Sequence, residues 1–62
     1  MGSVWLIEKP NGLYLTLWDF QIGWTGDPYK AFRFARYEDA AAFNMTFFGQ
    51  PPILHEVEHT FG

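Results

Sequence analysis

The sequence contains no cysteine, so disulfide bonds and thiolate metal ligands are both excluded. Only four lysine and arginine residues stand against seven acidic ones, and the net charge is −3. This balance disfavours direct binding to nucleic acid, because contacts with the phosphate backbone require many basic side chains. No stretch approaches the ~20 apolar residues of a membrane span, and no secretory signal pattern is present. We therefore expect a cytoplasmic protein without a membrane anchor.

Aromatic residues, in contrast, are abundant and make up 21% of the 62 residues. A domain this short buries only about 60% of the surface of its unfolded chain, and each aromatic side chain can bury ~150–250 Å². A few of them can therefore build the core of one domain spanning residues 1–62. The three Trp, three Tyr and seven Phe are more than such a core can hide. Exposed aromatic side chains favour binding interfaces.

The N-terminal third has the pattern of a β-hairpin. Residues 4–8 are β-branched and aromatic, and residues 13–18 alternate with a period of two. Residues 9–12, Lys-Pro-Asn-Gly, have the turn chemistry that joins two such strands. Further along, residues 24–25 suggest a short return strand. Residues 29–36 are ambiguous, because Phe32 and Phe34 alternate as in a strand whereas Tyr29, Phe32 and Arg36 suit a helical turn. We expect a short strand or extended segment at residues 31–34.

The second half of the chain has one helix pattern followed by one strand pattern. Residues 37–48 carry acids in the first turn, where the helix dipole favours them, and Gly49 with two prolines follows. The apolar arc of this helix contains Tyr37, Ala40, Phe43, Asn44, Phe47 and Phe48. Residues 53–61 alternate as in a strand, and we expect the face that carries Val57 to be the core side. The sum is an α+β domain in the order ββ(β)αβ, with one helix on an antiparallel sheet of three or four strands.

Residues 55–59 read His-Glu-Val-Glu-His, which matches the H-E-x-x-H pattern of zinc proteases. That chemistry requires a helix, on which residues i and i+4 lie ~5–6 Å apart. On a strand the same two residues are ~13 Å apart, too far to share one ion. No nucleophile stands beside a base elsewhere in the sequence. We therefore expect no enzyme activity, no metal and no cofactor, and a zinc hydrolase is a remote alternative.

Charge and aromatic residues indicate where a partner would bind. Residues 37–62 carry four acids and no lysine or arginine, so we expect them to face a basic surface of a host protein or protein complex. Three aromatic residues near the end of a predicted hairpin are expected to be exposed and to act as anchors, whereas Trp5, Phe43, Phe47 and Phe48 are expected in the core. The candidate partner-binding residues are Glu38, Asp39, Glu56, Glu58, Trp18, Phe20 and Trp24. An alternative is a single-stranded nucleic-acid binder that stacks bases on Tyr14, Trp18 and Arg33.

The chain also resembles a group of small proteins encoded by phages and prophages of proteobacteria. The resemblance rests on four short segments: Trp24-Thr25-Gly26-Asp27-Pro28, Ala31 to Phe34, Glu38-Asp39-Ala40 and Glu58-His59-Thr60-Phe61. It implies an accessory protein of the bacterial cytoplasm with no catalytic residues to carry over. Anti-CRISPR proteins are one class of this kind, and several are acidic DNA mimics that cover the DNA-binding surface of an effector. The expected function is therefore a non-enzymatic, protein-binding inhibitor of the anti-CRISPR type.

Overall fold

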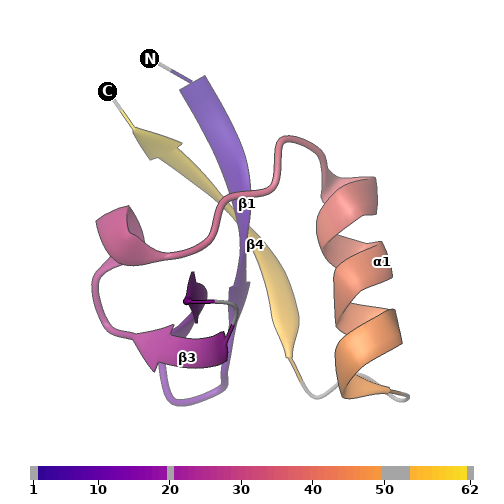
Figure 1. Ribbon diagram of the computed structural model, residues 1–62. Helices are drawn as coiled ribbons and strands as arrows, with labels where there is room; N and C mark the ends of the chain where they lie inside the picture. The colour runs from indigo at the N-terminus through magenta and orange to yellow at the C-terminus, as the bar shows by residue number, and fades with distance from the viewer. Residues whose placement is uncertain (1, 20, 50–53, 62) are drawn as a thin grey trace.

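The chain folds as a four-stranded antiparallel sheet with one α-helix on one side (Figure 1). The computed structural model describes residues 2–19, 21–49 and 54–61. The elements, in chain order, are β1 (Gly2–Glu8), β2 (Tyr14–Trp18), β3 (Gln21–Thr25), the 3-10 helix η1 (Pro28–Lys30), α1 (Tyr37–Phe48) and β4 (His55–Phe61). The sheet order is β3-β2-β1-β4. The predicted α+β architecture is confirmed, and the helix has the predicted bounds. No described helix has the length and apolar character needed to cross a membrane.

Turn chemistry sets the two hairpins. Between β1 and β2, the Lys9 N–H donates to the carbonyl of Leu13 at 2.7 Å, and Asn11 Oδ1 accepts from the Leu13 N–H at 3.2 Å. Gly12 has φ 89, a conformation that glycine adopts without steric cost. Between β2 and β3, Asp19 has φ 52, which aspartate tolerates better than most residues. Gln21 pairs with Trp18, so β3 begins at Gln21, earlier than the predicted return strand at residues 24–25.

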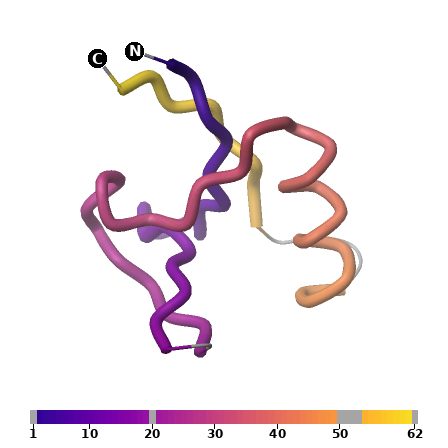
Figure 2. Tube along the Cα trace, turned by 45° about the horizontal axis from the view of Figure 1, so that its top comes forward, coloured from indigo at the N-terminus to yellow at the C-terminus, as the bar shows by residue number. Residues whose placement is uncertain are grey.

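Strands β1 and β2 diverge strongly. They pair only at Glu8 and Tyr14, whereas β1 pairs with β4 along its whole length. Residues 31–34 fill the gap between the two diverging strands. Phe34 and Trp5 exchange backbone hydrogen bonds of 2.8 and 2.9 Å, and the Phe32 N–H donates to Leu15 at 2.9 Å. The segment is therefore extended, as expected, but it inserts between two strands and forms only an isolated bridge. Figure 2 shows the connection from η1 to α1 crossing the β1–β4 pair.

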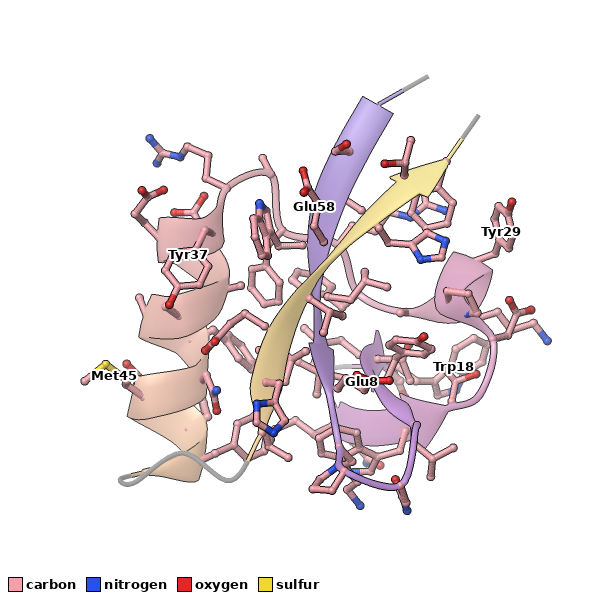
Figure 3. The ribbon with its side chains drawn as sticks, turned by 180° about the vertical axis from the view of Figure 1, so that it is seen from behind. Glu8, Trp18, Tyr29, Tyr37, Met45 and Glu58 are labelled. Carbon is pink, nitrogen blue, oxygen red and sulfur yellow. The ribbon has the colours of Figure 1, made fainter. Side chains whose placement is uncertain are left out.

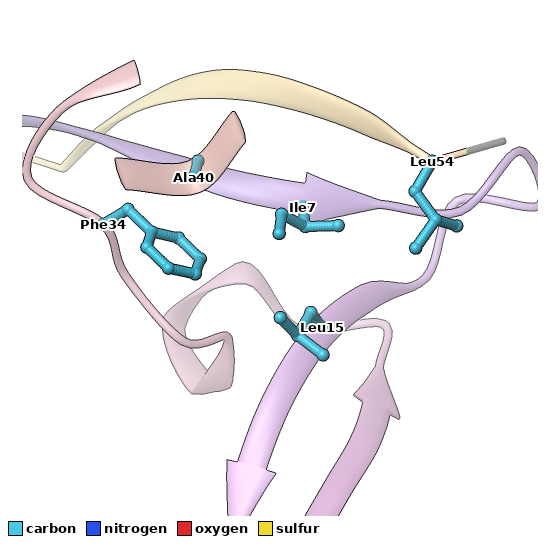
Figure 4. Close-up of a cluster of buried hydrophobic side chains, with 5 residues drawn as sticks. All are labelled: Ile7, Leu15, Phe34, Ala40 and Leu54. Carbon is cyan, nitrogen blue, oxygen red and sulfur yellow. The ribbon is translucent and has the colours of Figure 1, made fainter. Parts of the chain in front are cut away.

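Both faces of the β1–β4 pair are covered. The adjacent residues Leu6 and Ile7 point to opposite faces, and both have 0% exposure. On the Ile7 face the core cluster consists of Ile7, Leu15, Phe34, Ala40 and Leu54. Figure 4 shows Ile7 between Ala40 and Leu15, with Phe34 and Leu54 at either end. On the opposite face, Tyr29 of η1 contacts His59 and Phe61.

The Val57 face of the last strand, the expected core side, does bury Leu6, but the main core cluster lies on the opposite face. Leu54 is buried in the core cluster, and Glu56, two residues further, is hydrogen-bonded to α1. Val57 pairs with Leu6 on the opposite face and is half-buried. Because η1 covers one face and α1 the other, apolar residues occur on both, and alternation alone cannot indicate the side of the main core. Ile53, the first residue of the predicted strand, lies outside the described residues.

Candidate functional site

Two of the predicted acids lie in the first turn of α1. Glu38 and Asp39 are both exposed, and their position suits the positive end of the helix dipole. Asp39 also accepts from Arg36: Nε lies 3.3 Å from Oδ2 and Nη2 lies 3.4 Å from Oδ1. This hydrogen bond, together with the charges of Asp39 and Glu38, raises the pKa of Arg36 above its ordinary value. Arg36 therefore stays charged and partly neutralises Asp39, which leaves Glu38 as the more available acid of the pair.

The two acids on β4 differ in their surroundings. Glu56 is half-buried, and its Oε2 accepts from Asn44 Nδ2 at 2.8 Å. The same Asn44 nitrogen donates to the carbonyl of Leu54 at 3.1 Å. Glu56 thus ties the edge of the sheet to α1, a structural role that the sequence analysis missed. Glu58 is exposed and lies opposite Trp5 in the sheet.

Packing between Trp5 and Tyr37 brings the exposed acids to one end of the molecule. The two rings meet edge to face with centroids 5.2 Å apart. Trp5 is the sheet partner of Glu58, and Tyr37 precedes Glu38, so both acids flank this aromatic contact. Figure 3 shows Glu58 and Tyr37 at the same end of the molecule. Among the described residues the ion pair of Arg36 and Asp39 is the only one, so Glu38 and Glu58 are acids without an ion-pair partner at this end.

The predicted aromatic anchors Trp18 and Trp24 differ in how far their side chains are exposed to solvent. Trp18 ends β2 and is 79% exposed, as expected. Trp24 is half-buried, in contrast to the prediction, because it faces α1 and packs against Phe48 with centroids 5.8 Å apart. The ammonium group of Lys9 covers its ring at 4.4 Å. Phe20 lies outside the described residues, so its predicted role as an anchor stays a prediction.

One expected core residue is on the surface. Trp5, Phe43 and Phe48 pack against the core, as predicted. Phe47 is 60% exposed, although its ring stacks on that of Phe43 at 4.4 Å. The helical wheel placed Phe47 within the apolar arc, but the buried residues of α1 are Ala40 and Asn44. The packing of the helix on the sheet, and not the wheel, therefore decides that Phe47 faces solvent.

A hollow of about 530 Å³ lies beside Trp18. It is lined by Thr16, Leu17, Trp18, Thr25 and Lys30. Thr16 Oγ1 donates to the carbonyl of Lys30 at 2.8 Å, which holds η1 against β2. Apolar groups dominate the lining, and the lysine and the threonines supply polar groups at its edge. We call this feature the Trp18 hollow, and it suits the insertion of an apolar side chain.

An aromatic cluster that sequence reasoning did not identify joins η1 to β4. The ring of Phe61 lies 4.8 Å from Tyr29 and 4.5 Å from His59, measured between centroids. The guanidinium carbon of Arg33 lies 4.1 Å from the centre of the Phe61 ring. Arg33 therefore stacks on Phe61, not with Tyr14 and Trp18 as the predicted base-stacking platform required. Figure 3 shows Tyr29 and Trp18 on the opposite side of the β1–β4 pair from Tyr37 and Met45.

The His-Glu-Val-Glu-His segment lies on β4, as predicted, and not on a helix. His55 and His59 share one face of the strand at a separation of ~13 Å, and Glu56 and Glu58 lie on the other. Within residues 2–19, 21–49 and 54–61, no three His, Asp or Glu side chains are grouped to hold a metal ion. The segment therefore lacks the helical geometry on which zinc-protease chemistry depends.

The structure thus separates the predicted partner-binding residues into two surfaces. The acidic end, formed by Glu38 and Glu58, lies beside the start of α1. The Trp18 hollow lies beside η1, across the β1–β4 pair. Glu56 and Trp24 belong mainly to the packing of the domain. Comparison of the chain with protein-family models, with curated proteins and with solved structures finds no match in any of the three.

Proposed function

We propose that this chain is a non-enzymatic module that binds another protein or protein complex. The observation that carries the proposal is the exposure of Trp18, which leaves 79% of a large apolar side chain in solvent beside the Trp18 hollow. A domain this short gains stability by burying its aromatic side chains, so an exposed tryptophan is unfavourable for the free protein. Tryptophan residues that are exposed in the free protein commonly provide much of the binding energy of an interface.

The charges support a partner with a basic surface. Glu38 and Glu58 are exposed acids without an ion-pair partner among the described residues. Charges of this kind increase the association rate with a surface of opposite sign. The domain measures 33 × 23 × 23 Å, so a cleft in a larger complex can contact the acidic end and the Trp18 hollow together.

The more specific form of the proposal is a phage-encoded inhibitor in the cytoplasm of a bacterial host. In this form the acidic end occupies the basic nucleic-acid site of an effector complex, as an anti-CRISPR protein of the DNA-mimic type does. This form is supported by the resemblance of four short segments to small phage and prophage proteins, and by the concentration of acids in residues 37–62. The partner-binding residues of this form are Glu38 and Glu58 for charge and Trp18 for anchoring.

The test starts with capture of partners from lysates of candidate hosts, followed by titration of the purified complex with variants. Trp18→Ala should weaken binding at least about tenfold, which corresponds to ~1.4 kcal/mol, mainly through faster dissociation. Met45→Ala is the matched control, because Met45 is 49% exposed and lies on the opposite side. Equal affinities of the two variants would contradict the assignment of Trp18.

The charge assignment is tested with Glu38→Gln and Glu58→Gln combined. This variant should slow association and flatten its dependence on salt concentration, because steering by charge is screened by salt. Glu56→Gln is the control, since glutamine can still accept the hydrogen bond from Asn44. Reversing the charge at Glu56 is unsuitable, because it would break a contact that holds the fold.

A second candidate function is favoured by the aromatic cluster on η1 and β4. Tyr29 is 65% exposed, and Arg33 and Lys30 lie close to it in the chain. Single-stranded nucleic acid binds such combinations by stacking its bases on aromatic rings and guanidinium planes. Titration of a labelled oligonucleotide at low salt decides this point. Binding at micromolar protein that is lost in Tyr29→Ala would favour this function over protein binding.

A further inference from the structure

The backbone bonds of Trp5 reveal which groups of β4 face outward. Both the N–H and the carbonyl of Trp5 bond to Phe34, on the β2 side of β1. Because these groups alternate along a strand, the even-numbered residues of β1 point theirs toward β4. Their partners in register are His55, Val57, His59 and Phe61. The N–H and carbonyl groups of Glu56, Glu58 and Thr60 therefore point away from the sheet.

These outward groups lie on an open edge. Strand β4 is the last in the sheet order, and among the described residues it pairs only with β1. The helix reaches the start of this edge, where Asn44 of α1 bonds to the Leu54 carbonyl and to the Glu56 side chain. Glu58 and Thr60 lie beyond that contact and are exposed. An unpaired strand edge is a template for an added strand.

Charge determines what can occupy this edge. In a full-length antiparallel pair of two β4 strands, Glu58 would lie opposite Glu58 of the second copy. A shift toward the start of the strand would place Glu56 opposite Glu58. Like charges directly opposite one another destabilise strand pairing, so the glutamates oppose self-association. The exposed carboxylate of Glu58 attracts a lysine or arginine on the facing side of an incoming strand.

We propose that the free edge of β4 binds an extended basic segment of the partner, which adds a strand to the sheet. The outward N–H and carbonyl groups of Glu56, Glu58 and Thr60 form the backbone ladder. Glu58, the exposed acid of this strand, selects a basic residue on the helix-facing side. This inference rests on the proposed protein-binding function and names the chemistry of the partner at the acidic end.

The test uses a synthetic peptide of alternating lysine and valine with the length of β4. Its control is a peptide of the same composition with the lysines grouped at one end. The alternating peptide should bind more tightly and should slow hydrogen exchange at the amides of Glu56, Glu58 and Thr60. Equal binding of both peptides, or protection elsewhere, would overturn the inference.

Two variants separate the backbone ladder from the charge. Glu58→Gln removes the charge, and Glu58→Pro removes both the charge and the outward N–H. Proline is tolerated where the lost N–H faces solvent at a sheet edge, so both variants should fold. Glu58→Pro should bind the alternating peptide about tenfold more weakly than Glu58→Gln. His59→Pro removes an N–H that bonds to β1 and should therefore destabilise the domain. This result would confirm that the N–H of His59 points into the sheet and the N–H of Glu58 away from it.

The remaining outcomes distinguish this inference from the proposed function. A captured partner that is lost by Trp18→Ala but retained by Glu58→Pro would overturn strand addition and leave the protein-binding function in place. Loss of the partner from both variants supports strand addition. A dimer in sedimentation that Glu58→Pro abolishes would identify a second copy as the occupant, and would overturn the basic strand.

Discussion

Asn44 connects the helix to the sheet through one side chain. It lies in the apolar arc of α1 with 0% exposure, and its Nδ2 bonds to Leu54 and Glu56. Its Oδ1 is buried and has no hydrogen-bond partner among the described residues. The two hydrogen bonds of Asn44 fix the position of β4 against α1, because a shift of the strand along the helix would break both of them.

Asn44→Ala should lower the free energy of unfolding by about 1–3 kcal/mol, because the Leu54 carbonyl and the Glu56 carboxylate lose their donor. Urea denaturation measures this change as a lower midpoint with an unchanged slope. Asn44→Asp replaces the donor with a second carboxylate beside Glu56, so it should be more destabilising at neutral pH. That additional loss should shrink as the pH falls and one carboxyl group takes up a proton. A stability of Asn44→Ala equal to that of the unmodified protein would contradict the role of this contact.

At the scale of the element, α1 lacks a side-chain cap at its N-terminus. Its N-cap residue is Arg36, which has extended dihedral angles but no hydrogen bond from its side chain to the first-turn amides. The Arg36 side chain instead pairs with Asp39 at the surface, and an exposed pair of this kind contributes little to stability. The helix therefore depends on its packing against the sheet and on the acids of its first turn.

Arg36→Ser should stabilise the domain, because serine at the N-cap accepts a hydrogen bond from a first-turn amide. We expect the melting temperature to rise by about 4–8 °C, as for a domain of this size. Arg36→Ala is the control, since it removes the pair with Asp39 without adding a cap. Calorimetry of the two variants decides the point: a melting temperature for Arg36→Ser no higher than for Arg36→Ala would refute it.

The elements that sequence predicted best are those defined by local chemistry. The turn at residues 9–12 and the helix at residues 37–48 carry their own start and stop signals, and both are confirmed. The exposure of Trp24 and Phe47, in contrast, depends on how the hairpin and the helix pack together. No periodicity within one segment encodes that packing. The hydrogen bond of Glu56 with Asn44 depends on the same tertiary packing, so its structural role could not be predicted.

At the scale of the whole molecule, the β1–β4 pair lies between two layers. The helix α1 covers the Ile7 face, and η1 contacts the opposite face through Tyr29 (Figure 1). A domain of this length has a total stability of only about 3–9 kcal/mol. Loss of packing on either face should therefore affect the whole domain and not only one layer.

Leu6→Ala and Ile7→Ala should each lower the free energy of unfolding by about 2–5 kcal/mol, although their side chains point to opposite faces. Chemical denaturation followed by tryptophan fluorescence and by circular dichroism measures both variants. Coincident transitions in the two signals are expected, since the layers share β1. If only Ile7→Ala were strongly destabilised, the Leu6 face would be a loose cover and not part of the core.

The pairing of β1 with β4 also determines when the domain can form. Ser3 bonds to Thr60 across 57 positions in the sequence, so the central strand receives one of its two neighbours from the far end of the chain. Closing so large a loop lowers the entropy of the chain before the contacts between the two strands can form, and this slows folding. During synthesis on the ribosome, β1 therefore leaves the exit tunnel long before its partner, and its apolar side chains stay available to chaperones until the last strand emerges.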